Sequence, residues 1–205
     1  MSSLQEKATT SVLESASMSE NIVNGVNVAA LSQIAGNVKE NPAVAKFRFE
    51  VKNGWLGGAH SRSIVNQFYR AGQNVERSQS FWLHSDEPPM LLGGDLGPNP
   101  GEYLLHALAA CVTSAMVFHA AARGIAIEEV ESMVEGDVDL RGFMGLDKNV
   151  RNGFQNIRMN FAIRAEMGDQ ELQELAMLGP AFSPVFDTLT RGVPITVQAH
   201  RMNKG

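Results

Sequence analysis

The sequence predicts an α+β fold, and three observations carry this prediction. Residues 100–123 form an apolar, alanine-rich segment with almost no charge between Glu102 and Arg123. Segments in which apolar and polar residues alternate come before and after it, with turn residues between them. The resulting order is strands, a buried helix, strands, a helix and a strand, which is typical of antiparallel sheets with packed helices and not of a doubly wound fold.

The N-terminal part is expected to hold a tail and one short helix. Roughly the first eighteen residues are rich in Ser, Thr and Glu without an apolar period, which is typical of a mobile tail. Asn27 can cap a helix that Asn41-Pro42 ends. We therefore divide the chain into 1–43, a tail with a short helix, and 44–205, the main domain.

The next elements are predicted to be three antiparallel strands that form a small sheet. Residues 45–52 alternate perfectly between apolar and charged side chains, and Asn53-Gly54 then signals a hairpin turn. Further strands are expected at 60–69 and 80–84, with a turn at 71–74 between them.

The central apolar segment is predicted to be a helix that ends at Arg123-Gly124. Because it is apolar on nearly all sides, it is expected to be sandwiched in a core or a subunit interface. A helical wheel gives two faces: Leu104, Leu108, Cys111, Ala115, Phe118 and Ala122 on one, and Glu102, His106, Ala109, Thr113 and Met116 on roughly the opposite one.

The C-terminal half is predicted to hold two strands, helical segments and a last strand. Residues 130–140 and 157–165 alternate, the first with acidic and the second with basic side chains outward, so opposite charges should face each other. Asp169 can cap a helix closed by Gly179-Pro180, and Ser183-Pro184 can open a short helical turn. The last strand is expected at Val193 to Ala199.

Composition excludes several classes of partner. The chain has 205 residues, 44% of them hydrophobic, and a formal net charge of -5. We therefore expect one main globular domain and no nucleic-acid or anionic membrane partner. The polar residues Glu102, His106 and His119 interrupt the apolar run, which favours a buried helix over a membrane span. One cysteine and no signal-peptide pattern indicate a cytoplasmic protein.

The single cysteine, Cys111, is the candidate for chemistry, and two interpretations stay open. A free cysteine is often a small buried hydrophobe with no chemical role. A reactive thiolate needs some solvent access and a nearby cation, and Cys111 is nearly three turns from its helix start, so the helix dipole helps little. A cation would have to come from another segment, and Arg62 or Arg70 could supply it.

No metal or cofactor is expected from the sequence. His106 and His119 are thirteen residues apart and, with Cys111, lie on different faces of the helix. The glycine-rich run at 93–100 lacks the residues of a phosphate cradle. His60 and His84 could join across the sheet, although the spacing does not require it. A metal-dependent hydrolase using His60, His106 and His119 is the least supported alternative.

The run from Gly97 to Cys111 (GPNPGEYLLHALAAC), the acidic strand after it and the late Ser183-Pro184-Val resemble the OsmC/Ohr family. These are osmotically induced and organic hydroperoxide resistance proteins, and the resemblance covers roughly residues 47–197. It implies an OsmC-like α+β fold with antiparallel sheets around long buried central helices. It also implies an intertwined homodimer with active sites at the subunit interface.

The resemblance further implies that a cysteine at the position of Cys111 attacks a hydroperoxide and becomes a sulfenic acid. A second cysteine then resolves it, a dithiol such as a lipoyl group is the reductant, and an arginine and a glutamate hold the thiolate. This chain departs from the pattern at three places. Ser183 stands where the second cysteine is expected, Glu102 comes one residue late, and Arg62 comes three residues after the expected position.

Two functions follow from this pattern. The first is a single-cysteine thiol peroxidase for organic hydroperoxides in oxidative stress defence, with Cys111, Arg62 and Glu102 as site residues and an external thiol as reductant. The second is a non-catalytic protein of the same fold that binds an apolar small molecule at the dimer interface. Its apolar lining would come from Leu104, Leu108, Met116 and Phe118.

Overall fold

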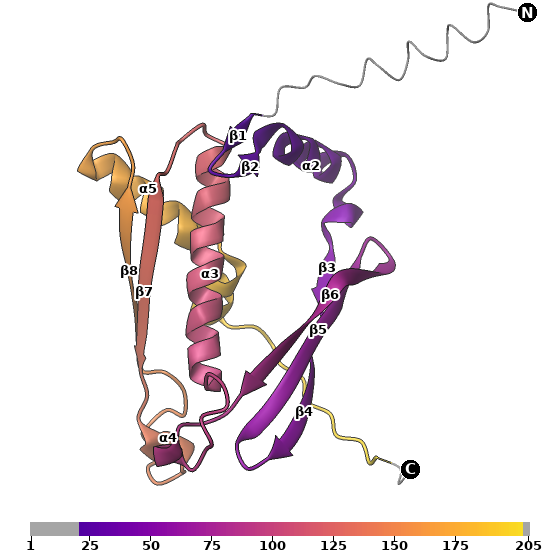
Figure 1. Ribbon diagram of the computed structural model, residues 1–205, viewed down its shortest axis with the longest axis vertical. Coiled ribbons are helices and arrows are strands. Elements are labelled where there is room, and N and C mark those ends of the chain that lie inside the picture. Colours follow the sequence, from indigo (N-terminus) through magenta and orange to yellow (C-terminus); the bar gives the residue numbers. More distant parts are fainter. Residues whose placement is uncertain (1–20, 203–205) are drawn as a thin grey trace, which may run out of the picture. The chain divides into compact units, whose positions relative to one another are not determined.

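The computed structural model describes residues 21–202 (Figure 1). The chain divides into two units. The first unit is the chain up to Tyr103 together with Phe118–Glu128, and the second is Leu104–Val117 together with the chain from Glu129 onward. The predicted mobile tail lies outside the described residues. The predicted division at residues 43 and 44 stays a prediction.

The first unit begins with a short hairpin followed by a helix. Strands β1 (Ile22–Val23) and β2 (Val26–Asn27) pair around a tight turn, which the sequence analysis missed. Helix α2 (Val28–Glu40) follows, and the Asn27 side chain accepts a hydrogen bond from the Ala30 N–H at 2.9 Å. The predicted cap and the end of this helix at Asn41 are confirmed.

The main element of the first unit is a four-stranded antiparallel sheet in which β5 is central. Strand β5 pairs with β3, β4 and β6, the last through a long hairpin. The strands at 60–69 and 80–84 are confirmed, and β6 is longer than predicted. The turn is limited to Ala71-Gly72 because β6 already begins at Gln73, and the strand predicted at 45–52 is divided between β3 and the start of β4. The strands are β3 (Phe47–Phe49), β4 (Lys52–Gly57), β5 (His60–Arg70) and β6 (Gln73–Ser85).

The predicted hairpin turn at Asn53-Gly54 is wrong. Both residues lie inside β4, where the Asn53 amide donates hydrogen bonds to the hydroxyl oxygens of Ser61 and Ser63 on β5. The chain instead turns after Gly57, where φ is +134° at Gly57 and +55° at Gly58. Glycine adopts such angles without a steric penalty, so the glycine pair places the turn here.

The second unit contains a two-stranded antiparallel sheet and helical segments. Strands β7 and β8 pair along their whole length. The predicted charge complementarity is confirmed, because Arg158 lies 2.6 Å from Glu135 and Arg164 lies 2.7 Å from Glu129. The elements are β7 (Glu129–Asp137), α4 (Leu140–Phe143), β8 (Asn156–Arg164), α5 (Asp169–Phe182) and α6 (Pro184–Arg191).

Three predictions in the second unit are wrong. The N-cap of α5 is Gly168 and not the predicted Asp169, which is the first residue of the helix. Helix α5 continues through Gly179-Pro180 to Phe182, since Gly179 is a site of close packing and not a helix end. A Cβ at Gly179 would lie 2.5 Å from Cγ1 of Val112 on α3, so only glycine fits there. The segment from Val193 to Ala199 is exposed and pairs with no strand among the described residues.

Helix α3 (Pro100–Ala121) confirms the predicted central helix, and Gly124 follows it with φ of 70°. The two predicted faces differ in exposure. Met116 is fully buried and shares a stripe with the buried Val112, whereas Phe118 is 47% exposed. Among residues 21–202, α3 is the one helix whose length and composition would allow it to cross a membrane.

Candidate functional site

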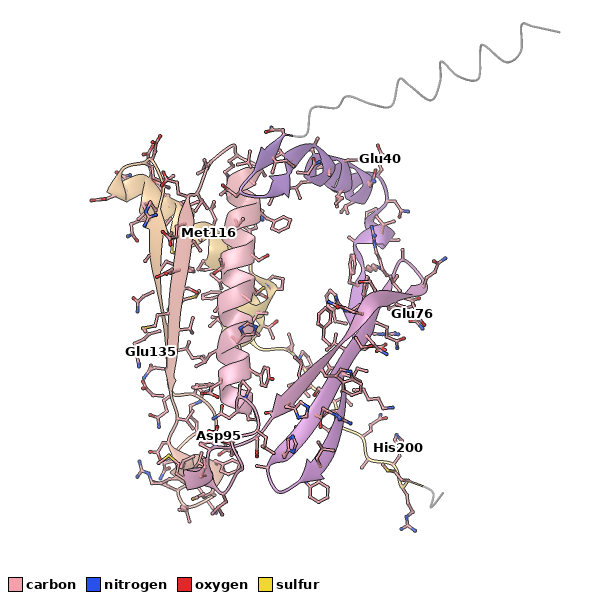
Figure 2. All side chains as sticks on the ribbon, in the orientation of Figure 1. Glu40, Glu76, Asp95, Met116, Glu135 and His200 are labelled. Atoms are coloured by element: carbon pink, nitrogen blue, oxygen red, sulfur yellow. The ribbon has the colours of Figure 1, made fainter. Side chains whose placement is uncertain are left out.

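Cys111 lies in the middle of α3, within the second unit. Its neighbours on the helix, Leu108 and Val112, are buried, while Cys111 itself is half-buried and is a free thiol. Met116, labelled in Figure 2 on α3, continues the buried stripe one turn beyond Val112. The residue is thus partly exposed, and some solvent access is one requirement for a reactive thiol.

The start of α3 explains the position of Glu102. The Glu102 carboxylate accepts a hydrogen bond from the Asn99 N–H at 2.8 Å, and the Asn99 side chain accepts one from the Glu102 N–H at 2.8 Å. These reciprocal bonds form a capping box, which satisfies two N–H groups that the helix leaves free. One oxygen of Glu102 is thus engaged in holding the helix start.

Arg62 and Arg70 both lie on β5 and stack on aromatic rings. The Arg62 guanidinium lies 4.8 Å from the centre of the Trp82 ring, and that of Arg70 lies 5.3 Å from the Phe47 ring. Stacking holds each guanidinium in place while its N–H donors stay available. Both arginines and Glu102 belong to the first unit and Cys111 to the second, so their assembly into one site stays a prediction.

Ser183 stands between α5 and α6 and is 2% exposed. Its hydroxyl oxygen accepts a hydrogen bond from the Phe186 N–H at 3.1 Å, which makes it the N-cap of α6. The predicted capping role is confirmed. A serine cannot form a disulfide, so the chain has no second cysteine with which to resolve an oxidised Cys111.

A cavity of about 930 Å³ lies within the second unit. Its walls are mainly apolar and come from one side of β8, from α5 and α6, and from Leu104 and Leu108 of α3. Two of the four residues expected to line an apolar site therefore do line this cavity, and Met116 and Phe118 do not. Its other apolar walls include Met159, Phe161, Leu172 and Phe186.

A polar cluster lies at the end of the β5–β6 hairpin, and of its members the sequence analysis considered His60 and His84 but missed Asp86. His60 and His84 are hydrogen bonded to each other across the two strands, with Nε2 of His60 at 2.9 Å from Nδ1 of His84. Asp86 follows at 2% exposure and accepts hydrogen bonds from three backbone N–H groups. Two features of the sequence could have indicated the role of Asp86: it is an aspartate before a turn, and the Gly93-Gly94 pair follows. Short polar side chains often bind the backbone of such loops.

Residues 21–202 contain no group of three or more His, Cys, Asp or Glu side chains that could hold a metal ion. The described part of the chain therefore offers no set of metal ligands for a metal-dependent hydrolase. His60 is bonded to His84, and His106 lies in the second unit while His60 and His119 lie in the first. Burial, followed by the charge of Arg123, lowers the pKa of His119.

Comparison with known proteins identifies the fold. The structure is similar to the crystal structure of an OsmC like protein from Mycoplasma pneumoniae, with 17% identity, a TM-score of 0.55, and coverage of 70% of this chain and 87% of that chain. A protein from Psychrobacter arcticus 273-4, described as an osmotic stress induced and detoxification response protein, matches with 14% identity and a TM-score of 0.50. This match covers 67% of this chain and 85% of that chain.

No curated protein sequence matches the chain significantly. The model of the OsmC-like protein family does match it, over residues 93–198. This range includes the glycine-rich run, the whole of α3 with Cys111, the β7–β8 pair and the segment after α6. The structural matches support the same α+β fold that the sequence predicts. The chain therefore belongs to the OsmC-like protein family.

Proposed function

We propose that this protein is a single-cysteine thiol peroxidase that reduces organic hydroperoxides in oxidative stress defence. The observation that carries the proposal is a lone, free and half-buried thiol on α3, within the segment that matches the family. A cytoplasmic location follows from the same thiol, because the reducing cytoplasm keeps such a group free. The substrate class comes from the resemblance to hydroperoxide resistance proteins.

The reaction would proceed in two halves. The Cys111 thiolate attacks the hydroperoxide, so that an S–O bond forms, the O–O bond breaks, and the leaving alkoxide takes up a proton to become an alcohol. Cys111 is then a sulfenic acid. An external thiol attacks its sulfur and releases water, and a second thiol breaks the resulting mixed disulfide and restores Cys111. The second half needs the external thiol because Ser183 cannot replace a resolving cysteine.

We propose Arg62 as the cation that favours the thiolate and Glu102 as a residue that orients the arginine. The stack on Trp82 would pre-organise the Arg62 guanidinium, which lowers the entropic cost of binding an anion. The capping box engages Oε2 of Glu102 and leaves Oε1 without a hydrogen bond to any residue in the described range 21–202. Arg70 is the matched control, since it lies on the same strand and stacks on Phe47 in the same way.

The test is a thiol titration followed by turnover. Reduced protein mixed with cumene hydroperoxide should lose one titratable thiol per chain, and added dithiol should restore it. Cys111→Ser should abolish turnover, and Arg62→Ala should slow the loss of the thiol while Arg70→Ala should not. A Cys111 that stays fully titratable in excess hydroperoxide would refute the peroxidase. Equal rates for the two arginine variants would remove Arg62 from the site.

The cavity of the second unit favours one alternative, a protein that binds an apolar small molecule. A volume of about 930 Å³ is within the range of sites for drug-sized ligands, and its lining is mostly apolar. Native mass spectrometry of the purified protein would show such a ligand as added mass. Ala176→Leu, which adds bulk to the cavity wall, should reduce the bound fraction. Full hydroperoxide turnover with no bound ligand would reject this alternative.

Family members are typically homodimers, and we propose the same assembly here. The exposed stretch from Val193 to Ala199 supports this, because its alternating apolar residues would be buried by pairing with another strand; Ile195 is 82% and Val197 86% exposed. Sedimentation equilibrium should give twice the chain mass. Ile195→Lys with Val197→Lys should shift the protein toward monomer, whereas a monomeric wild-type protein would refute the dimer.

A further inference from the structure

Two histidine rings share a hydrogen bond where the sheet of the first unit ends. Nε2 of His60 lies 2.9 Å from Nδ1 of His84, and the ring centroids are 5.2 Å apart at an interplanar angle of 25°. In an N–H···N bond one nitrogen carries the proton and the other is bare. The contact therefore exists only while at least one of the two rings is neutral.

The backbone of His84 supports the beginning of α3. Its carbonyl oxygen accepts a hydrogen bond from the Tyr103 hydroxyl at 2.7 Å. The same carbonyl contacts the backbone of Gly97, where any Cβ would collide with it. Both the first turn of α3 and the loop before it thus depend on where His84 lies.

The charges around the pair can compensate one proton better than two. Asp86 is the anion nearest to His84 in the sequence. Burial alone would raise the pKa of Asp86, but the backbone N–H groups of Glu87, Gly94 and Leu96 and the charge of His60 together lower it by more. Arg62, on β5, adds a positive charge two residues after His60. Tyr103 faces His84 from α3 with a neutral hydroxyl. The end of β4 beside His60, from Gly54 to Gly57, carries no charged residue.

We propose that His60 and His84 form a proton-operated latch that holds the first turn of α3 against the sheet. With one shared proton between the rings, the latch is closed. When both rings are fully protonated, two N–H groups face each other and the rings separate. The opened form then binds one more proton than the closed form, so opening becomes about tenfold more favourable for each unit by which the pH falls.

The chain provides its own reporters for this hairpin. Its two tryptophans, Trp55 on β4 and Trp82 on β6, both lie in the sheet of the latch. The Trp55 indole donates a hydrogen bond to the Gly58 carbonyl at 3.0 Å, in the turn just before His60. Tryptophan fluorescence therefore reports on this end of the sheet and on little else.

The experiment compares hydrogen exchange and fluorescence at about pH 7.5 and about pH 5.5, on either side of ordinary histidine titration. After correction for intrinsic exchange rates, amides of residues 84–106 in the wild-type protein should lose about tenfold or more in protection at the lower pH. The fluorescence should change over the same range. The double variant His60→Gln/His84→Gln should show neither change. His200→Gln, at the exposed histidine labelled in Figure 2, should behave as the wild type.

A second variant keeps the proposal testable if the double variant is unstable. Tyr103→Phe removes only the hydroxyl that binds His84, so residues 100–106 should already be poorly protected at about pH 7.5. Their exchange should then depend little on pH. The proposal is overturned if wild-type protection in residues 84–106 is equal at the two pH values, or if Tyr103→Phe leaves protection and its pH dependence unchanged.

Discussion

The contact between Gly179 and Val112 gives a test of how α5 packs on α3 within the second unit. A Cβ at Gly179 would lie 2.5 Å from Cγ1 and 2.7 Å from the carbonyl oxygen of Val112, and real Cβ contacts are longer than 3.0 Å. The oxygen belongs to the backbone of α3 and cannot rotate away. Gly179→Ala must therefore push the two helices apart or distort one of them.

The magnitude follows from two opposing terms. Replacing glycine by alanine inside a helix favours folding by about 0.5–1 kcal/mol. Overpacking a close contact costs about 1–3 kcal/mol. The overpacking term is the larger, so Gly179→Ala should lower the free energy of unfolding by about 1–2 kcal/mol. The buried residues nearest this contact, Val112 and Leu175, leave little room for relaxation.

Gly36 is the matched control for this substitution. It lies inside α2, and a Cβ placed there has no atom within 4 Å. Only the helix-propensity term applies, so Gly36→Ala should raise the free energy of unfolding by about 0.5–1 kcal/mol. Urea unfolding of the two variants, followed by circular dichroism, measures both values. If Gly179→Ala proved as stable as Gly36→Ala, the close packing of α5 on α3 would be wrong.

Three further predictions concern caps and a loop. Ser183→Ala should cost about 1 kcal/mol, because the α6 N-cap is lost, and Ser183→Thr should recover most of it in urea unfolding. Asn99→Ala should lower amide protection in the first turn of α3, whereas Asn99→Asp should preserve it. The pKa of Asp86 is lowered in the folded protein, so the ionised carboxylate contributes to the free energy of unfolding. This contribution is complete above the ordinary aspartate range and is lost as the pH falls through the folded pKa. Asp86→Asn should therefore reduce the slope of stability against pH below about pH 4. An unchanged slope would show that the carboxylate does not hold the loop.

The sequence predicted well wherever a local pattern decides the structure. Asn27 caps α2 and Ser183 caps α6, because a side chain that accepts a bond from the helix start needs no distant partner. The β7–β8 pair was predictable for a related reason, since acidic and basic outward faces on successive strands favour one pairing.

The errors occur where a distant contact overrides the local signal. Gly179-Pro180 is a usual helix end, yet the approach of Val112, sixty-seven positions earlier in the sequence, requires glycine inside the helix. Asn53-Gly54 is a strong hairpin signal, but Ser61 and Ser63 bind the Asn53 amide and keep it in the strand. Neither partner could be identified from periodicity.

The same distinction between local patterns and distant contacts applies to the candidate site. Cys111 stands out in the sequence because it is the single thiol in an apolar helix, and the structure places it on α3 with partial exposure. Arg62 was first considered as a cation from another segment and Glu102 from the resemblance, and each has a local partner in its own unit, Trp82 for the one and Asn99 for the other. A role for either in catalysis must therefore be compatible with these contacts. The Trp82 stack leaves the guanidinium N–H donors free for a thiolate, whereas the capping box already engages one oxygen of Glu102, so a substitution at Arg62 should affect thiol reactivity more than one at Glu102.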